Sequence, residues 1–154
     1  MDALKETIQI RLIERLREEE GGVYSPGIRA ATSKLPQGRF SLTVSFGCAP
    51  QNVEKLIAST LDEVNKIKAN GPLQVNLDKF KAETQRSIEL QLKSNNFWQS
   101  YIVSQIQNKE PLDVVNAYSE DVDKITTEEI KAMANKYLSG KNFIRMVLLP
   151  EKVK

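Results

Sequence analysis

The segment Arg11–Pro26 constrains the fold most, because a charged helical run meets two consecutive glycines and then an extended sequence. A first helix is predicted from Ala3 to Glu20, with an apolar residue at every fourth position along one face. Gly21 or Gly22 supplies the left-handed cap that ends such a helix. The chain is therefore expected to reverse its direction at the glycine pair.

Two side chains flank this reversal and are the candidate functional residues. Arg17 lies in the last turn of the predicted helix, and Tyr24 lies just inside the extended segment that follows. A reversal between them places the guanidinium and the phenol on one side, as a donor pair suited to a carbonyl oxygen, an oxyanion or a phosphate. The alternative is that Arg17 forms a solvated ion pair with Glu14 or Glu20, worth about 0.2–0.5 kcal/mol. Tyr24 would then be an ordinary strand aromatic.

A β-hairpin is predicted directly after the reversal. Val23–Ser33 reads as extended, with a bulge or bend at Pro26-Gly27, and a turn at Leu35–Gly38 leads into Phe40–Cys48. Apolar and polar residues alternate along this second strand, which predicts one buried face and one polar face. The polar face is expected to form the wall of a cleft beside the arginine and tyrosine, or else to be merely solvated.

The rest of the chain is predicted to be helical up to one last strand. Asn142–Leu149 has apolar residues on both sides, which predicts a strand covered on both faces. The aromatic run at Phe97, Trp98 and Tyr101 is expected to lie in the core. The predicted helices are Pro50–Ala69, a helix with Asn76 as N-cap that runs to Leu92, a third over 97–106 after a break at Asn95-Asn96, a short one within Pro111–Asp123, and one from the capping box Thr126–Glu129 to Gly140.

This order of elements predicts a single α+β layered domain over residues 1–154, with a small antiparallel or mixed sheet packed against several helices. The net charge of +2 creates no field that would attract nucleic acid, so no nucleic-acid partner is expected. We predict no membrane span, because no apolar run approaches about 20 residues. The chain has no histidine and one cysteine, Cys48, so neither a zinc site nor an internal disulfide is expected.

Several stretches resemble the insulinase or pitrilysin family of zinc metallopeptidases, and in particular the C-terminal, non-catalytic domain of those enzymes. The resemblance covers nearly the whole chain in the same order, although it begins part-way into the usual domain. We therefore expect a fragment that lacks the first strands of that domain. The stretches are Leu16–Ser25, Phe46–Val53, the capping box at Thr126, and Val147–Pro150.

The resemblance implies a specific function. In that family, the N-terminal domain holds zinc through an inverted H-x-x-E-H motif, and the C-terminal domain closes over the peptide substrate. Arg17 and Tyr24 match the family's arginine and tyrosine, which implies that Arg17 binds a substrate carbonyl and Tyr24 steadies the oxyanion. This chain alone is expected to have no catalytic residues, no cofactor and no peptidase activity. Zinc is expected in the catalytic domain of the parent protein, which is the implied partner together with the peptide substrate.

Two other functions remain open from the sequence: a structural scaffold relative without a proteolytic role, and an unrelated α+β ligand-binding module with a closed apolar pocket near Trp98. The chain is expected to be soluble, and the bacterial periplasm or cell envelope is the expected compartment of the parent protein. Self-association of the fragment is also expected, because a sheet of about three strands leaves edges unpaired.

Overall fold

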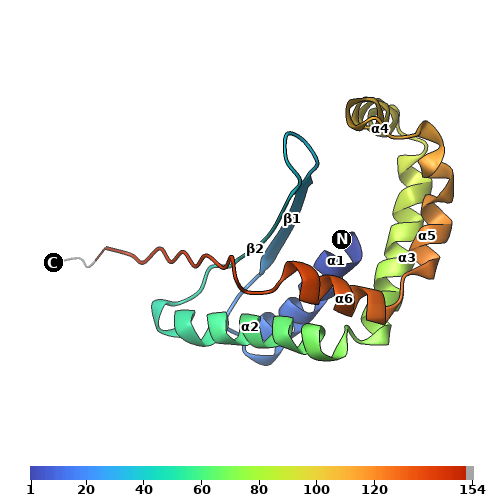
Figure 1. Cartoon of the computed structure of the whole chain (residues 1–154). Helices are drawn as coiled ribbons and strands as arrows, with labels where there is room; N and C mark the ends of the chain where they lie inside the picture. Colours follow the sequence, from blue (N-terminus) through green and yellow to red (C-terminus); the bar gives the residue numbers. More distant parts are fainter. Residues whose placement is uncertain (152–154) are drawn as a thin grey trace.

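The computed structural model describes residues 1–151, and within them it has six α-helices and one antiparallel sheet of two strands (Figure 1). This confirms the α+β class with a small sheet, although helices dominate and the sheet has one strand fewer than expected. The elements in chain order are α1 (Asp2–Leu12), the π-helix η1 (Ile13–Glu19), β1 (Gly27–Ser33), β2 (Arg39–Ser45), the 3₁₀ turn η2 (Pro50–Asn52), α2 (Val53–Asn70), α3 (Gln74–Gln91), α4 (Asn95–Asn108), the 3₁₀ helix η3 (Leu112–Ala117), α5 (Tyr118–Lys124) and α6 (Thr127–Tyr137).

Helix α1 is the centre of the core. Its predicted stripe continues into η1 and is at most 2% exposed, at Leu4, Ile8, Leu12 and Leu16. Helices α2, α3 and α6 and strand β1 all contact α1, so its apolar face is covered from several sides. Each such side chain contributes about 1.5–3 kcal/mol when it is fully buried. The position of α1 therefore determines where η1 and the glycine pair lie.

The hairpin rises from the end of this helix (Figure 1). Its register pairs Gly27 with Ser45 and Ser33 with Arg39. The first strand is shorter than predicted, because Pro26 has no backbone N–H to donate and pairing begins one residue later. The alternation predicted for the second strand is confirmed, with half-buried apolar residues and exposed polar ones, although the strand ends at Ser45 rather than Cys48.

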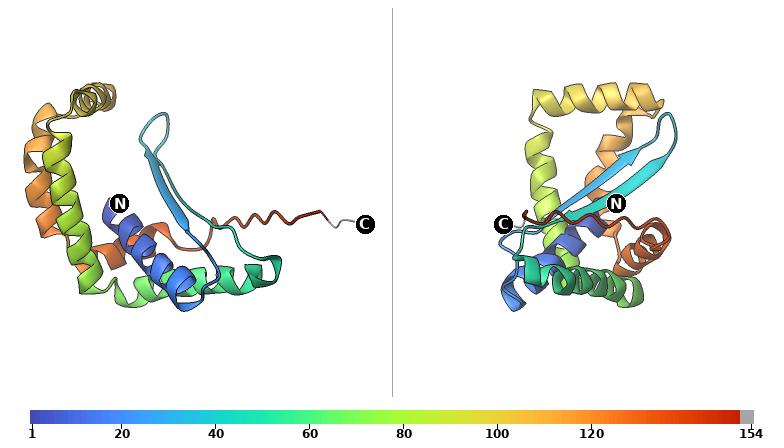
Figure 2. Two further views of the ribbon diagram at one scale, coloured as in Figure 1. Left: turned by 180° about the vertical axis from the view of Figure 1, so that it is seen from behind. Right: turned by 90° about the vertical axis from the view of Figure 1, so that its left-hand side faces the viewer.

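Helices α3 and α5 lie side by side as an arm, and α4 crosses its far end (Figure 2). The tip of the hairpin reaches this end, where Lys34 Nζ lies 2.6 Å from Glu110 Oε1. The prediction that the aromatic run lies in the core is wrong. The rings of Phe97, Trp98 and Tyr101 pack on one another but stay half-buried, because the described chain has no element that covers α4.

Three predicted helix boundaries are also corrected. Helix α3 begins before Asn76, with Leu73 as the N-cap residue, and Asn76 is buried inside the first turn. The break before α4 falls at Leu92–Ser94, so Asn95 is already helical. Helix α6 ends at Tyr137, before Gly140, because Leu138 has left the helical conformation. The capping box is confirmed, since Thr126 and Glu129 exchange both hydrogen bonds.

The last strand is the largest error of the sequence prediction. Residues 142–149 form no strand, and their six apolar side chains, Phe143 included, are between 42% and 98% exposed. The segment leads away from the body of the molecule (Figure 1), and its Arg145 pairs with Glu54. An apolar pattern specifies a strand only where a neighbouring strand completes its backbone hydrogen bonds. The described residues do not place one beside this segment.

Candidate functional site at the helix–hairpin junction

The helix that carries Arg17 widens before it ends. From Ile13 to Glu19 the backbone follows a π-helix, and the Glu20 N–H donates to the Arg15 carbonyl at 3.1 Å. The next closure is wider still, from the Gly22 N–H to the Leu16 carbonyl at 3.1 Å. Such π segments are rare and occur often at functional sites. The widening rotates the last turn relative to an ideal α-helix, which the apolar spacing of four residues in the sequence does not reveal.

The two glycines have different roles in the reversal that follows. Gly21 has φ +60°, a left-handed conformation that side chains with a Cβ rarely adopt. Gly22 instead allows close packing, because a Cβ at that position would lie 2.8 Å from Leu56 Cδ2 on α2. Val23 then enters the core at 5% exposure. The turn is thus fixed on both sides of the glycine pair.

This turn brings the two predicted residues together. The Arg17 guanidinium carbon lies 5.8 Å from the centroid of the Tyr24 ring, which is within the range of a cation–π contact. Tyr24 is 87% exposed and Arg17 is also exposed. Neither side chain has a hydrogen bond or ion pair to another residue within 1–151. The guanidinium N–H groups and the phenol therefore face solvent as a pair.

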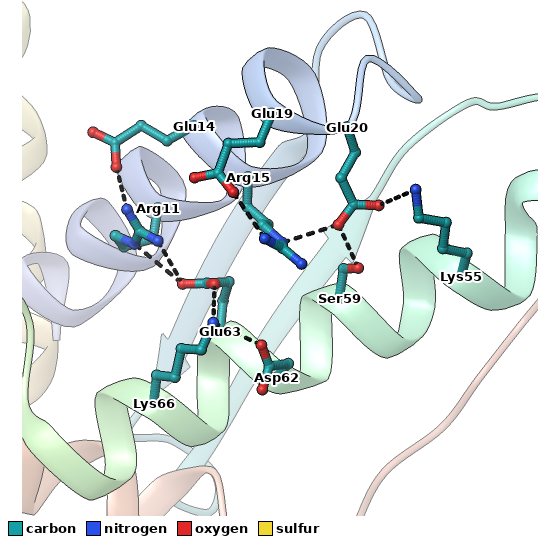
Figure 3. Close-up of polar contacts among 10 residues, drawn as sticks. All are labelled: Arg11, Glu14, Arg15, Glu19, Glu20, Lys55, Ser59, Asp62, Glu63 and Lys66. Carbon is teal, nitrogen blue, oxygen red and sulfur yellow. Dashed lines mark hydrogen bonds and ion pairs between the residues drawn. The ribbon is translucent and has the colours of Figure 1, made fainter.

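The acidic residues that might have paired with Arg17 are bound elsewhere (Figure 3). Glu14 accepts a hydrogen bond from Arg11 at 2.6 Å. Glu20 Oε1 accepts one from Ser59 at 2.6 Å, and the Glu20 carboxylate also pairs with Arg15 and Lys55. The solvated ion pair considered as an alternative for Arg17 is thus absent from the described contacts.

A second buried carboxylate joins α2 to α1. Glu63 of α2 is 1% exposed and accepts from Arg11 Nη2 at 3.0 Å and from Lys66 at 2.8 Å. Sequence reasoning missed this residue, although a signal was present. Glu63 falls on the buried stripe of α2, between Leu56 and Ile67 at helical spacing. A charged residue on an apolar stripe indicates a buried ion pair.

The ion pairs shift the pKa values of their members. The hydrogen bond from Ser59, together with Lys55 and Arg15, lowers the pKa of Glu20 below its ordinary value, although its burial opposes the change. The hydrogen bond to Glu19 raises the pKa of Arg15. Glu20 is therefore ionised at neutral pH, and its charge is matched by the groups around it.

The junction offers hydrogen-bond donors rather than metal ligands. An exposed guanidinium and phenol can donate to a peptide carbonyl or to a developing oxyanion. The residues of this chain do not fit a zinc site, because there is no histidine and residues 1–151 contain no cluster of three possible ligands. Two cavities of about 210 and 200 Å³ lie beside α6 and α2, and neither is lined by Trp98.

The fold places the molecule in the class of α+β domains in which a helix–hairpin unit packs on a group of helices. Residues 2–84, which include η1, the glycine pair and the hairpin, match the family model described as the peptidase M16 inactive domain. This match covers more than half of the 154 residues. The chain therefore belongs to the peptidase M16 inactive domain family, which confirms the resemblance to the non-catalytic domain of zinc metallopeptidases.

A curated relative and two solved structures extend this match. The chain is 27% identical over 157 aligned positions to the probable zinc protease PqqL of Escherichia coli. This alignment covers 98% of this chain and 16% of that protein. The crystal structure of the periplasmic protease PqqL from Escherichia coli has a TM-score of 0.75 at 22% identity, over 90% of this chain and 15% of that one. The crystal structure of a peptidase M16 inactive domain from Pseudomonas fluorescens has a TM-score of 0.73 at 19% identity, over 88% of this chain and 34% of that one.

These two structural matches show a shared fold. The chain spans only about a sixth of the length of the curated relative that it matches. No helix within residues 1–151 is long and apolar enough to cross a membrane.

Proposed function

We propose that this chain is a substrate-binding, non-catalytic domain that helps to close the proteolytic chamber of a zinc-dependent metalloendopeptidase. The observation that carries the proposal is the exposed Arg17–Tyr24 pair, with which no other described side chain forms a hydrogen bond or an ion pair. Arg17 binds a carbonyl oxygen of the peptide substrate, and the Tyr24 phenol donates to the oxyanion that forms when the carbonyl is attacked. Family membership supports this reading.

The partners follow from the same proposal. The zinc ion and the general base belong to a catalytic domain of the parent protein, against which this domain closes over the peptide. The relative from Escherichia coli is named a probable zinc protease and its structure is that of a periplasmic protease, which supports the bacterial periplasm or cell envelope as the compartment. A further proposed partner is a second copy of the chain, because no strand within residues 1–151 covers either edge of the two-stranded sheet.

Peptide binding to the chain tests the proposal. Unstructured peptides are titrated into the parent chain, an Arg17→Ala variant and an Arg86→Ala control, with affinity measured by fluorescence anisotropy. Arg86 is an exposed arginine of α3, on the arm of the molecule. Its removal changes the net charge by the same amount as the removal of Arg17. A charge-assisted hydrogen bond is worth about 1.5–3 kcal/mol. We therefore expect Arg17→Ala to bind about 10- to 100-fold more weakly.

The control should keep the affinity of the parent chain. Equal affinity of the Arg17→Ala and Arg86→Ala variants contradicts the proposed role of the arginine and favours the scaffold reading. The coding sequence around the chain provides an independent test, because the proposal requires a zinc motif of the H-x-x-E-H type in the same protein or in a subunit encoded beside it.

A further inference from the structure

The last glutamate of the acidic run Glu18-Glu19-Glu20 differs from the first two. Carboxylates at the C-terminal end of a helix are disfavoured by the helix dipole, and Glu18 and Glu19 remain at the surface. Glu20 instead turns inward, and only 6% of its side chain is exposed. A carboxylate buried to this degree must be compensated by hydrogen bonds and opposite charge.

Those partners join two elements (Figure 3). Ser59 Oγ donates to Glu20 Oε1 at 2.6 Å, and Lys55 Nζ lies 3.2 Å from Oε2; both partners are on α2. From its own helix, Arg15 Nε lies 2.9 Å from Oε1. Glu20 therefore attaches the end of η1 to α2.

This attachment lies at the centre of the proposed site. Leu56, the residue under Gly22, stands between Lys55 and Ser59 on α2, so the glycine turn and the Glu20 carboxylate rest on the same helical turn. Arg17 precedes Glu20 by three positions, and Tyr24 follows it by four. Since neither the arginine nor the tyrosine side chain has a hydrogen bond or ion pair within the described chain, the backbone on both sides of Glu20 sets their relative position.

We propose that Glu20 is the positioning residue of the Arg17–Tyr24 pair, which it holds in cation–π contact by fixing the end of η1 to Lys55 and Ser59 of α2. The consequence for catalysis rests on the proposed function, whereas the geometric statement does not. A misplacement of about 1 Å in a substrate-orienting group can lower a rate about 100-fold. A residue that contacts no substrate can therefore affect turnover strongly.

NMR spectroscopy of the full chain tests the geometric statement. The Tyr24 ring shifts the side-chain protons of Arg17 and gives nuclear Overhauser contacts to them, and a Tyr24→Leu variant identifies that ring shift. Glu20→Ala should lose both signals, while the resonances of the distant capping box at Thr126 stay unchanged. Glu18→Ala removes the same charge from the same helix end without breaking any described contact, and it should keep both signals. Retention of the Arg17 ring shift in Glu20→Ala overturns the proposal.

A second variant keeps the test valid if Glu20→Ala does not fold. Ser59→Ala removes the shortest hydrogen bond to the carboxylate and leaves Glu20 itself in place. It should weaken the Overhauser contacts between Arg17 and Tyr24, and an unchanged spectrum contradicts the proposal. Glu20→Gln should restore part of the signal, because its amide oxygen still accepts from the Ser59 hydroxyl.

Kinetics of the complete peptidase separate the two proposals. Glu20→Ala should lower kcat by up to about 100-fold, and its effect should be smaller when Tyr24 is already phenylalanine, because only Arg17 then remains to be misplaced. If Glu20→Ala loses the contact between Arg17 and Tyr24 but Tyr24→Phe is fully active, the substrate-binding function is wrong and the positioning role stands. If the contact persists in Glu20→Ala, the positioning role is wrong whatever the activity.

Discussion

Arg17 and Tyr24 meet in a cation–π contact across the glycine turn. Their common side of the junction was predictable, because two glycines between a helix and a strand require a reversal. Their contact at 5.8 Å was not, because it depends on the π-helical last turn and on the fit of Gly22 against Leu56. Neither feature has a local sequence signature, since both arise from packing between elements far apart in the chain.

The buried carboxylate of Glu20 gives a pH prediction at the same scale. Its pKa in the folded chain is lowered from an ordinary value of 4.5, chiefly by the Ser59 hydrogen bond. A lowered folded-state pKa means that its contribution to stability is complete above the unfolded pKa and disappears as the pH falls through the folded value. We therefore expect Glu20→Gln to be less stable than the parent chain near about pH 6, with the difference shrinking toward about pH 3.

Urea unfolding followed by circular dichroism at several pH values measures this difference. Glu18→Gln is the matched control, because Glu18 is exposed and makes no described contact, and it should change the free energy of unfolding little at any pH. A stability difference between the parent chain and Glu20→Gln that stays constant over the whole range would show that the carboxylate's charge has no stabilising partner in the folded state.

At the scale of elements, the close approach of the glycine turn to α2 leads to a stability prediction. Gly22→Ala places a Cβ 2.8 Å from Leu56 Cδ2, and Leu56 is 1% exposed, so its side chain has little room to move. Overpacking of this kind costs about 1–3 kcal/mol. We expect the free energy of unfolding of Gly22→Ala to fall by this amount in urea.

Gly47→Ala is the control for this substitution. A Cβ at Gly47 meets no atom within 4 Å, and the residue does not have a positive φ. That variant should be as stable as the parent chain or slightly more stable, because alanine restricts the unfolded state. Equal stabilities of Gly22→Ala and Gly47→Ala would show that the turn is not packed against α2.

The elements themselves were predicted unevenly, for physical reasons. The apolar stripe of α1 and the capping box at Thr126 were predictable because both are encoded in local spacing. The strand predicted at 142–149 is not formed, because strand formation requires a partner that local spacing cannot supply. Asn76 misled for a similar reason. Asparagine favours an N-cap, but Asn76 lies buried in the first turn of α3 because tertiary packing overrides the local preference.

At the scale of the whole molecule, open sheet edges and exposed apolar side chains predict association between copies of the chain. Both outer edges of the hairpin are unpaired in residues 1–151, and Leu148 is 98% exposed within the apolar segment 142–149. Such edges and segments favour intermolecular pairing. We expect sedimentation to give masses above the 17.4 kDa of one chain as its concentration rises.

Leu148→Lys should weaken this association without affecting the fold, because the side chain makes little contact with the rest of the molecule. Val75→Lys changes a 54% exposed apolar residue of α3 outside the segment and serves as the control. A strict monomer at high concentration, or an equal effect of the two substitutions, would contradict pairing through 142–149.

The function proposed for the molecule depends on the Tyr24 phenol, and the kinetics of Tyr24→Phe in the complete zinc peptidase test it most directly. The ring and its contact with Arg17 remain, and the hydroxyl has no partner in the described chain, so the free energy of unfolding should not change. Loss of one oxyanion donor should lower kcat by about 10- to 1,000-fold. A variant with the turnover of the parent enzyme would contradict the substrate-binding account, as would one whose lost activity is explained by lost stability.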